Sequence, residues 1–568
     1  MAIISLNGDR VSISPNSPRE VPRLASAVHR VSPGALPRRD GTIVCDVNAL
    51  AALALELPPA QHSWDAASLS ALGRQEERRA RRASVRAQVE TALREPQRSV
   101  GSYPLLHRLD AHQVDVLAAL SVADLEGLGL FDEQGTGKTI SCLCGFDFLR
   151  WRGQVDQLLV VAPKSMAQTW AITAGEWFPK DGVAVVAGSS RRLTDEIAAA
   201  RDVLVVTYEA TVRAMSVVVA WARRQGRRTM LVVDESFFVK NPDAERSRAV
   251  AEVRRHCTKA VVACGTPAPN AAADIVHQMD VADMGHTFSD RSLRASEDPA
   301  LIATALHERA VFLRRLKHQV LSDLPSKAFT RLLVPMAPRQ REMYRQVRDK
   351  LALEVRGIDD VAFEKQYASF LAKRIALLQL CSHPAALDAA YDEVPAKLRA
   401  LDVLLRELIE ERKEKVVLWS FFTHSLDVLA TRYAHYGAVR IDGTVTDVAA
   451  RAEAVRAFQQ EEEVRLFLGN PAAAGAGITL TAARHAVYES FSNQAAHYLQ
   501  SLDRIHRRGQ TRNVEYHVLL CEGTVELPEY DRLLKKEERA SELLGDPAVP
   551  RLTREEFLAE LFAEEHPA

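Results

Sequence analysis

The amino-acid sequence predicts an α/β protein with two lobes, each built around a parallel β-sheet covered by helices. The first observation is a series of short apolar, β-branched runs that alternate with amphipathic stretches, at residues 158–162, 203–207, 230–233 and 260–264. The second is the return of this alternation at residues 415–419, 438–441, 464–468 and 486–488. Short apolar runs between helices are typical of a parallel, doubly wound sheet. The intervening residues, roughly 271–410, have a mainly helical pattern, which places helical insertions between the lobes.

A chain of 568 residues is too long for one ordinary domain. Composition and the strand pattern divide it into five units. We expect an N-terminal accessory region at residues 1–100, a first lobe at 101–285, helical insertions and an interlobe linker at 286–400, a second lobe at 401–535 and a C-terminal helical tail at 536–568.

The first hundred residues are rich in Pro, Arg and Ala. They contain a possible short strand at residues 41–47 and a charged helical stretch around residues 75–93. A charge run of this kind is more typical of a solvated helix face than of a DNA-binding arm. We interpret this region as an accessory module without an assigned substrate or partner.

The overall composition excludes several classes of protein. The formal net charge is -1, so the whole molecule is not attracted to polyanions, and any nucleic-acid site must be a local basic cleft. Seven cysteines are scattered without a C-x-x-C pair, which is typical of reduced core residues rather than of a zinc site or a disulfide framework. No stretch approaches the roughly 20 apolar residues that a membrane helix requires. These features predict a cytoplasmic protein without membrane association, and the Ala- and Arg-rich composition favours a bacterial source.

A glycine-rich loop at residues 131–139 precedes a helical run and has the pattern of a phosphate-binding loop. Backbone N–H groups of such a loop and the following helix amino terminus can bind phosphates, a lysine can reach the β and γ oxygens, and a hydroxyl can bind Mg²⁺. These roles fall on Gly135, Thr136, Gly137, Lys138 and Thr139. Asp132 stands where a strict Walker A pattern has glycine, so a simple glycine-rich turn is the alternative. The loop predicts that ATP and Mg²⁺ are cofactors.

Two adjacent carboxylates, Asp234 and Glu235, follow the apolar run at residues 230–233. Ligands of open α/β sheets bind at this carboxyl edge of the strands. Asp234 is suited to the Mg²⁺ shell together with Thr139, and Glu235 can orient and deprotonate the attacking water. A carboxylate pair in this place also commonly caps a helix. We interpret it as part of a nucleotide site because the sequence also contains the lysine loop.

Arg504 and Arg507 lie near the end of the second lobe, and we expect them to share one helix face. Two guanidiniums that point from a second lobe at the γ-phosphate would act as arginine fingers. The alternative interpretation is a solvated basic helix.

These pieces occur in an order that resembles the Swi/Snf-type ATPase family of helicase superfamily two, over approximately residues 105–530. The resemblance implies two RecA-like lobes. Gln113 lies in a segment similar to the family's Q motif, which implies that it reads adenine. Asp132 matches the family's own version of the phosphate loop.

Several further segments resemble family motifs that follow a DNA strand. Residues 160–165 with Trp170 are similar to motif Ia, residues 206–209 to motif Ib and residues 417–421 to motif IV. Strand ends followed by Ser, Thr or Lys donors suit phosphate contacts. The resemblance implies nucleic-acid contacts at Lys164, Ser165, Thr207, Tyr208 and Ser420.

The remaining motifs complete the family pattern. Residues 265–270 resemble motif III, and residues 312–315, 324–327 and 380–384 resemble the linker between lobes, which ordinary helicases of the superfamily lack. In the second lobe, residues 475–483 resemble motif V and residues 500–510 motif VI. We therefore expect Gly475, Gly477 and Gln510 to contribute to nucleotide binding.

Three departures from the family pattern limit what carries over. Phe237 stands where many relatives have His, which would remove a polar link between the acidic motif and motif III and puts coupling in doubt. Ala474 and Thr479 replace the usual Gly and Asn of motif V, and residues 491–493 replace a tryptophan-containing segment. We carry over no DNA contact from these positions.

The resemblance implies an ATP hydrolase that moves along double-stranded DNA without reading bases. One alternative is a strand-separating helicase, which would need an aromatic stacking path, whereas only 6% of the residues are aromatic. Another is an ATP-gated nucleic-acid-binding scaffold with weak hydrolysis and protein partners in a repair or defence system. Phe237 and the altered motif V motivate this second alternative.

Overall fold

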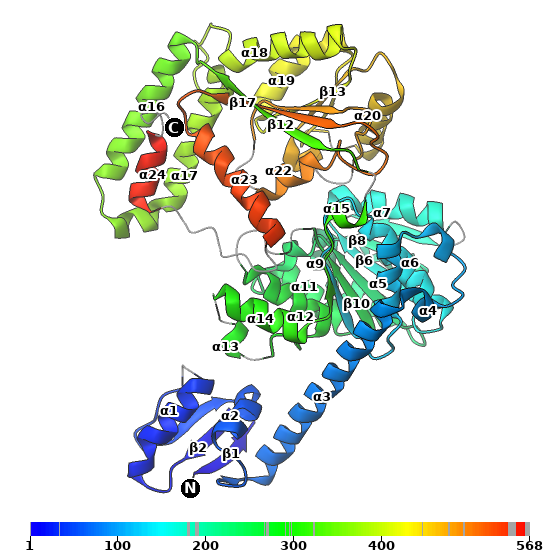
Figure 1. The fold of residues 1–568 in the computed structure, drawn as a ribbon, viewed down its shortest axis with the longest axis vertical. Helices are drawn as coiled ribbons and strands as arrows, with labels where there is room; N and C mark the ends of the chain where they lie inside the picture. Colours follow the sequence, from blue (N-terminus) through cyan, green and yellow to red (C-terminus); the bar gives the residue numbers. More distant parts are fainter. Residues whose placement is uncertain are drawn as a thin grey trace.

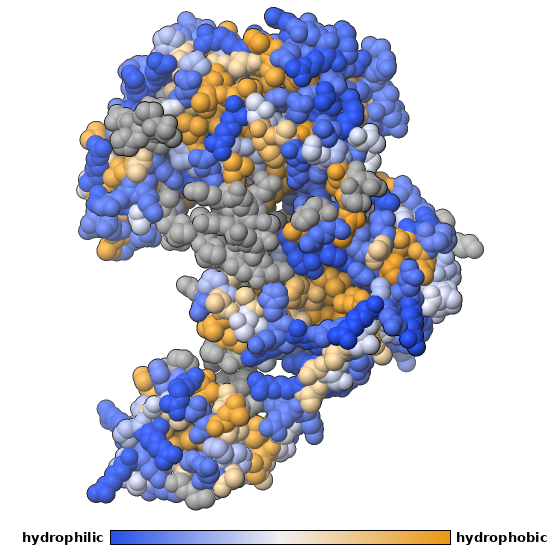
Figure 2. Space-filling model, viewed as in Figure 1, coloured by the Kyte–Doolittle hydropathy of each residue, from blue (hydrophilic) through white to orange (hydrophobic). Residues whose placement is uncertain are grey.

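The computed structural model describes most of the chain. The described residues are 2–8, 10–32, 35–178, 182–187, 192–265, 267, 272–289, 291–294, 296, 298–321, 324–445, 447–474, 478–491, 495–542 and 553–562. Figure 1 shows a small N-terminal module, a first lobe and a second lobe. Hydrophilic residues cover most of the surface in Figure 2, with hydrophobic residues gathered in patches.

The N-terminal module is a four-stranded sheet in the order β3-β2-β1-β4, covered by two helices. Its elements are β1 (Ile3–Asn7), β2 (Arg10–Ser14), α1 (Val21–Val31), β3 (Ile43–Asp46), α2 (Leu50–Glu56) and β4 (Ser63–Trp64). Ile4, Ile13 and Ile43 are fully buried between the sheet and the helices. The strand expected at residues 41–47 is confirmed as β3, and the module has its own core.

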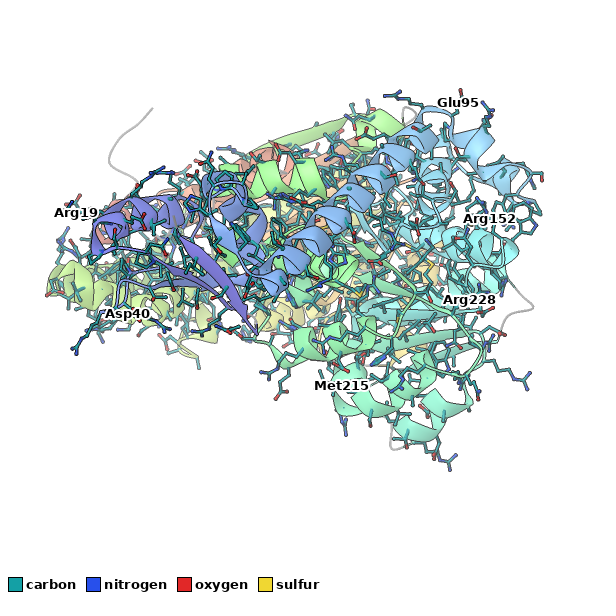
Figure 3. The ribbon with its side chains drawn as sticks, turned by 90° about the horizontal axis from the view of Figure 1, so that it is seen from below. Arg19, Asp40, Glu95, Arg152, Met215 and Arg228 are labelled. Atoms are coloured by element: carbon teal, nitrogen blue, oxygen red, sulfur yellow. The ribbon has the colours of Figure 1, made fainter. Side chains whose placement is uncertain are left out.

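A single long helix, α3 (Ala66–Arg94), joins this module to the first lobe. Asp65 caps its amino terminus, because the carboxylate accepts a hydrogen bond from the Ser68 N–H at 2.7 Å. Figure 3 shows the helix running from the N-terminal module to Glu95 at its far end. The helix expected around residues 75–93 is therefore confirmed, and Arg74, Arg79 and Arg81 on it are exposed.

The first lobe is built on a seven-stranded, fully parallel sheet in the order β11-β5-β10-β9-β6-β8-β7. The strands are β5 (Gly127–Leu130), β6 (Gln157–Ala162), β7 (Val183–Val186), β8 (Val203–Thr207), β9 (Thr229–Asp234), β10 (Lys259–Ala263) and β11 (Phe312–Leu313). All four strands predicted from the sequence are present. The sequence pattern missed β5, β7 and β11.

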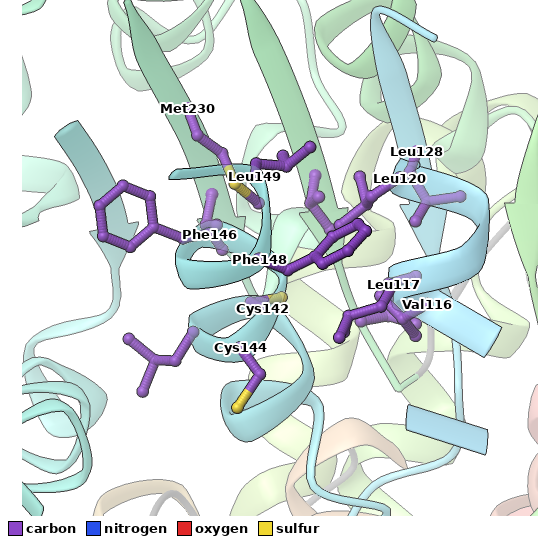
Figure 4. Packing of buried hydrophobic residues seen from close by; sticks show 14 of the residues in the cluster. Val116, Leu117, Leu120, Leu128, Cys142, Cys144, Phe146, Phe148, Leu149 and Met230 are labelled. Carbon is purple, nitrogen blue, oxygen red and sulfur yellow. The ribbon is translucent and has the colours of Figure 1, made fainter. Parts of the chain in front are cut away.

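Helices cover both faces of this first sheet. They are α4 (Pro96–Val100), α5 (Ala111–Leu120), α6 (Lys138–Trp151), α7 (Lys164–Trp177), α8 (Leu193–Ala199), α9 (Tyr208–Arg213), α10 (Met215–Ala222), α11 (Glu245–Arg254), α12 (Asp274–Asp283), α13 (Arg291–Arg294) and α14 (Pro299–Arg309). Val160 and Val161, neighbours on β6, belong to separate cores on opposite faces of the sheet. Figure 4 shows one of these cores, in which Phe148 of α6 points toward Leu120 and Leu128 and Phe146 points to the opposite side of the helix.

The second lobe repeats this architecture around a six-stranded parallel sheet in the order β12-β17-β16-β13-β15-β14. The strands are β12 (Lys327–Val334), β13 (Val416–Trp419), β14 (Val439–Ile441), β15 (Leu466–Gly469), β16 (His485–Tyr488) and β17 (Val514–Cys521). The accompanying helices are α18 (Ala396–Leu405) with a π-helical turn (Arg406–Glu411), α19 (Thr423–Arg432), α20 (Val448–Gln460), α21 (Pro471–Ala474) and α22 (Ala495–Leu502). The four strands predicted here are confirmed.

The interval expected to be helical, residues 286–400, also contributes strands to both sheets. β11 pairs with β5 of the first lobe, and β12 pairs with β17 of the second. The short helix α15 (Lys317–Val320) lies between them. The helical insertion consists of α16 (Pro338–Arg356) and α17 (Asp360–Ser382), and α24 (Arg554–Leu561) packs against it through Phe557. The last helix of the second lobe, α23 (Glu526–Glu542), precedes α24.

The sequence expectation for the cysteines is confirmed by the core. All seven cysteines are buried and free. Within the described part of the chain, we find no helix with the length and apolar character needed to cross a lipid bilayer.

Candidate nucleotide site between the lobes

The glycine-rich loop lies between β5 and α6, at the carboxyl edge of the first sheet. Gly135 and Gly137 have φ angles of 83° and 87°, which side-chain-bearing residues rarely adopt. A Cβ atom on Gly137 would lie 2.7 Å from Nε2 of Gln113, and one on Gly135 would lie 2.9 Å from Cε of Lys317. The glycines therefore permit both the turn and the close approach of these two side chains. The loop leads into the amino terminus of α6, where unpaired N–H groups favour an anion.

Lys138 and Thr139 begin α6, as the phosphate-loop pattern predicts. The Lys138 ammonium donates hydrogen bonds to the backbone carbonyls of Asp132 and Glu133, at 2.8 and 3.2 Å. The Thr136 hydroxyl donates to the Glu133 carbonyl at 2.9 Å and so closes the loop. The lysine is thus held inside the loop by neutral acceptors that phosphate oxygens can replace.

Asp132, the departure from the strict Walker A pattern, anchors the segment that leaves the first lobe. Its carboxylate accepts hydrogen bonds from Nη2 and Nε of Arg315, at 2.6 and 2.9 Å. Arg315 also donates to Asp115 on α5 at 3.0 Å. A bidentate pair of this kind fixes geometry as well as charge. Sequence reasoning noted the segment around Arg315 as a family feature but assigned it no role in the loop.

Asp234 and Glu235 lie at the end of β9, behind the loop. The Trp170 indole N–H donates to the Asp234 carboxylate at 2.7 Å, and burial raises the pKa of Asp234. Glu235 has a φ of 49°, and its carboxylate accepts a hydrogen bond from the Gln134 amide at 3.3 Å. Burial, and then the charge of Asp234, raise the pKa of Glu235 to about 7, whereas the charges of Lys138 and Arg504 lower it. Charges from both lobes therefore act on one carboxylate.

The donor set fits Mg²⁺ at this place. Desolvation of the two adjacent carboxylates, Asp234 and Glu235, disfavours their charged forms. A bound divalent cation would offset this cost. Carboxylate and hydroxyl oxygens are the ligands that Mg²⁺ prefers. Asp234 and Thr139 remain the residues that we expect to hold the ion.

A hydrogen-bonded link joins the acidic pair to motif III in spite of Phe237. The Ser236 hydroxyl donates to the Gln278 amide oxygen at 2.6 Å, and the Gln278 amide N–H donates to the Pro267 carbonyl. Phe237 itself stacks on Phe238, with ring centroids 4.5 Å apart. The polar connection that Phe237 was expected to remove is thus made through α12.

The second lobe contributes Arg504 and Arg507 to the same site, beside the phosphate loop. Arg504 is only 6% exposed, and it donates to the carbonyls of Gln500 and Ile478, at 2.7 and 3.2 Å. Arg507 donates to the Thr479 hydroxyl at 3.2 Å. Burial lowers the pKa of Arg504 to about 10, and the charge of Arg507 acts in the same direction. Buried guanidiniums of this kind are not a solvated basic helix, the alternative that the sequence left open.

The predicted placement of the two arginines on one helix face is wrong. Helix α22 ends at Leu502, and both arginines follow it in turns. The backbone of Arg504 is held instead by Leu480, whose N–H donates to the Arg504 carbonyl at 2.9 Å. Helical spacing therefore predicted the wrong local structure for these two residues.

Gln134 connects the two lobes through the phosphate loop. Its amide oxygen accepts a hydrogen bond from Nη2 of Arg504 at 3.4 Å, while its amide N–H donates to Glu235. Gly265 of motif III packs against this side chain, because a Cβ atom on Gly265 would lie 2.3 Å from Cγ of Gln134. The acidic pair, motif III and the second-lobe arginine thus meet at one glutamine that sequence reasoning did not single out.

A buried ion pair also crosses between the lobes next to the loop. The Lys317 ammonium forms a salt bridge with Asp503 and donates to the His506 carbonyl at 3.3 Å. The Lys317 backbone N–H donates to the Glu133 carboxylate at 2.7 Å. A second salt bridge between the lobes is exposed and joins Arg508 to Asp110 at 2.8 Å. In the sequence, the only feature that pointed to the Lys317–Asp503 pair was the basic run at residues 314–317.

Three of the residues expected to contact nucleic acid, Thr207, Tyr208 and Ser420, have buried side chains in this structure. Thr207 caps α9 by accepting a hydrogen bond from the Ala210 N–H at 3.2 Å, and the Tyr208 hydroxyl donates to the Asp234 carbonyl at 2.7 Å. The Ser420 hydroxyl donates to the Glu489 carboxylate at 2.8 Å. These groups hold the sheet edges in place. Lys164 and Ser165, at the start of α7, are exposed.

The two predicted glutamine contacts differ in their surroundings. Gln113 lies beside Gly137, and its amide oxygen accepts a hydrogen bond from the Asp110 N–H at 3.0 Å, which caps α5. Gln510 donates to the carbonyls of Ala483 and Ile505, at 2.9 and 3.2 Å, and accepts from two backbone N–H groups that follow it. The Gln510 side chain is therefore buried within its own loop and holds that loop in place. Gly475 and Gly477 lie outside the described residues.

The fold and the site define a protein of two RecA-like lobes with a candidate nucleotide site between them. The SNF2-related domain model matches residues 109–386, and the helicase conserved C-terminal domain model matches residues 396–509. The chain therefore belongs to the Swi/Snf-type ATPase family of helicase superfamily two.

Relatives share this core but are longer. The chain is similar to the ISWI chromatin-remodeling complex ATPase ISW1 of Saccharomyces cerevisiae, with 28% identity over 74% of this chain and 39% of that protein. It is 25% identical to an uncharacterized ATP-dependent helicase of Mycoplasma pneumoniae, over 76% of this chain and 41% of that protein. The chain thus spans about two fifths of the length of these curated relatives. The chain is also similar to the structure of a Sulfolobus solfataricus SWI2/SNF2 ATPase core in complex with dsDNA. The match spans 81% of this chain and 97% of that chain, with 22% identity and a TM-score of 0.35.

Proposed function

We propose that this protein is a motor that hydrolyses ATP between its lobes and uses the cycle to move along double-stranded DNA. The observation that carries the proposal is the hydrogen-bonded path from Arg504 through Gln134 to Glu235. This path joins the second lobe to the group suited to orient water, with the phosphate loop between them. A change in the nucleotide at the loop must therefore alter the contact between the lobes.

Binding would exchange contacts that the loop already makes. The triphosphate accepts hydrogen bonds from the N–H groups of the loop and the first turn of α6, and Lys138 leaves the carbonyls of Asp132 and Glu133 for phosphate oxygens. A bound Mg²⁺, held by Thr139 and Asp234, would neutralise charge on the phosphates.

Hydrolysis requires a positioned water and compensation of the charge that develops on the γ-phosphate. Glu235 is suited to take the proton of the water, because its raised pKa of about 7 makes the carboxylate a stronger base. Arg504, released from Gln134 by the incoming phosphate, would stabilise the transition state. Arginine fingers contribute roughly 10³ to 10⁵ in rate. Loss of the γ-phosphate then removes this attraction and lets the cleft reopen.

Duplex DNA is the proposed track, and the exposed Lys164 and Ser165 are the first-lobe residues that we assign to it. They follow β6 and begin α7, so a phosphate there would meet both side chains and a helix amino terminus. Contacts to phosphates carry no base information, and each one adds to salt dependence. Binding should therefore be insensitive to sequence and weaken as salt increases.

The test compares ATP turnover without nucleic acid, with single strands and with duplex, for the wild type and for Lys138→Ala. We expect duplex to stimulate the wild type most and the variant to lose nearly all turnover. The matched control is Lys164→Ala, which should keep basal turnover and lose part of the stimulation by duplex. Turnover that duplex fails to raise would favour an ATP-gated scaffold instead.

A second assay separates movement along a duplex from strand separation. The wild type should displace the third strand of a DNA triplex and should not open a duplex with a single-stranded tail. Efficient opening of the tailed duplex would contradict the translocase proposal and favour a helicase.

A further inference from the structure

A cluster of two histidines and a glutamate lies at the start of strands β16 and β17 in the second lobe. The register pairs His485 with Glu515 and Val487 with His517. Because side chains alternate along a strand, His485, Glu515 and His517 point to one face of the sheet. This is the amino edge of the strands, whereas the candidate nucleotide site lies at the carboxyl edges. The cluster therefore belongs to no part of the site described above.

The three candidate ligand atoms are spaced almost as a metal ion would require. Nδ1 of His485 lies 3.3 Å from Nε2 of His517 and 3.7 Å from Oε2 of Glu515. Nε2 of His517 lies 4.0 Å from the same carboxylate oxygen. In a tetrahedral zinc site with bonds of about 2.0 Å, neighbouring ligand atoms are roughly 3.3 Å apart. Small rotations of the side chains would bring the three atoms onto one ion.

Arg484 orients the Glu515 carboxylate toward the two imidazoles. His485 is fully buried, and its second ring nitrogen, Nε2, has no hydrogen-bond partner among the described residues. Nη1 of Arg484 donates to Oε1 of Glu515 at 3.3 Å, which leaves Oε2 to face the imidazoles. Nε of Arg484 donates to Glu414 at 2.9 Å, so the charge of this arginine is shared with a second carboxylate. Partners outside the ligands that fix ligand orientation are typical of metal sites.

We propose that His485, Glu515 and His517 bind a divalent transition-metal ion, with Zn²⁺ the best match and a water as the fourth ligand. Imidazole and carboxylate are the donors that Zn²⁺ takes with this geometry, and Mg²⁺ and Ca²⁺ prefer all-oxygen sites. The ion would tie the start of β16 to the start of β17 and so stabilise the second sheet. It would take no part in ATP hydrolysis.

The test uses the full chain, stripped with a chelator and titrated with Co²⁺, whose visible absorption reports four-coordinate binding. The wild type should bind a single equivalent with visible bands that Zn²⁺ abolishes and that excess Mg²⁺ does not. Glu515→Gln, which is partly exposed, and His517→Gln should lose these bands. Absence of the bands in the wild type, or their retention in both variants, would overturn the proposal and leave a hydrogen-bonded histidine pair.

Two controls keep the result specific to the cluster. Glu414→Gln removes a neighbouring carboxylate that contacts the same Arg484 and should keep the bands. Zn²⁺ should raise the thermal unfolding midpoint of the wild type and of Glu414→Gln, but not that of Glu515→Gln. If His517→Gln fails to fold, Glu515→Gln and the midpoints still decide the question, because equal Zn²⁺ stabilisation of Glu515→Gln and the wild type contradicts the assignment.

Discussion

The phosphate loop and the interlobe bridge at Lys317 meet at Gly135, and they hold their lysines differently. Lys138 donates to two backbone carbonyls of its own loop, and these neutral contacts can be exchanged for phosphate oxygens. Lys317 is buried and forms a salt bridge with Asp503 of the other lobe. Breaking a buried ion pair costs several kcal/mol, because one charge is left without a partner. Lys138, which we propose binds the nucleotide, is thus easily released from its contacts, whereas Lys317, which joins the lobes, is not.

The largest effect should come from removing the charge that the second lobe brings to the nucleotide. For Arg504→Gln we expect kcat to fall by about 10³ to 10⁵, with a smaller change in ATP binding. Steady-state ATP turnover at saturating duplex measures the effect, and Arg508→Gln is the control with a neighbouring arginine. A loss in Arg504→Gln no larger than in this control would place the catalytic arginine elsewhere.

The comparison of the two lysines is tested directly by Lys317→Met. This variant leaves Asp503 buried without its partner, and we expect it to lower the free energy of unfolding by about 3 to 5 kcal/mol. The double variant Lys317→Met with Asp503→Leu should recover most of the loss, because no unpaired charge remains. Urea unfolding of the three proteins measures the difference. Equal losses in the single and double variants would show that the charge pair is not what holds the lobes.

A substitution behind Gln134 should weaken catalysis without touching a charge. In Gly265→Ala, the new Cβ atom would lie 2.3 Å from Cγ and 3.2 Å from the backbone N of Gln134, so this side chain must shift. A displacement of about 1 Å can cost on the order of 10² in rate, and we expect such a fall in kcat. Gly443→Ala, where an added Cβ meets nothing within 4 Å, is the control. Unchanged turnover in Gly265→Ala would exclude Gln134 from the coupling path.

We expect the smallest effect on stability from the exposed salt bridge between Arg508 and Asp110. The Arg508 side chain is 66% exposed, so solvent screens the pair. We expect Asp110→Asn to change the free energy of unfolding by about 0 to 1 kcal/mol, and less at high salt. Urea unfolding at two salt concentrations measures it. A loss as large as that of Lys317→Met would remove the distinction between buried and exposed crossings.

The strands that sequence predicted and those that it missed differ in their residues. The apolar run Val203–Thr207 gives a clear signal, because β-branched residues favour strands. β5 contains Gly127 and Gly129, which weaken that signal, yet it is an interior strand of the sheet, between β11 and β10. Gly127 is required there because a Cβ atom would lie 1.9 Å from the Ala282 carbonyl oxygen. Close packing against α12 therefore requires glycine in β5, although glycine disfavours strands. This contact is between segments far apart in the sequence, so no local pattern predicts it.

The candidate site was predictable in its motifs but not in the contacts between them. Lys138 and Asp234 follow from a glycine loop and a strand end. Lys317 and Asp503 are 186 residues apart in sequence, so only the fold brings them together. Thr207 after a strand has the same pattern whether it faces DNA or caps the next helix, and here it caps α9.

Helix α3 has a mechanical consequence for the N-terminal module. Its 29 residues span about 44 Å at 1.5 Å per residue. A rotation of the first lobe by about 10° would carry the far end of such a rigid arm through roughly 8 Å. In the proposed ATP cycle, small rotations of the first lobe would therefore become a long displacement of the N-terminal module.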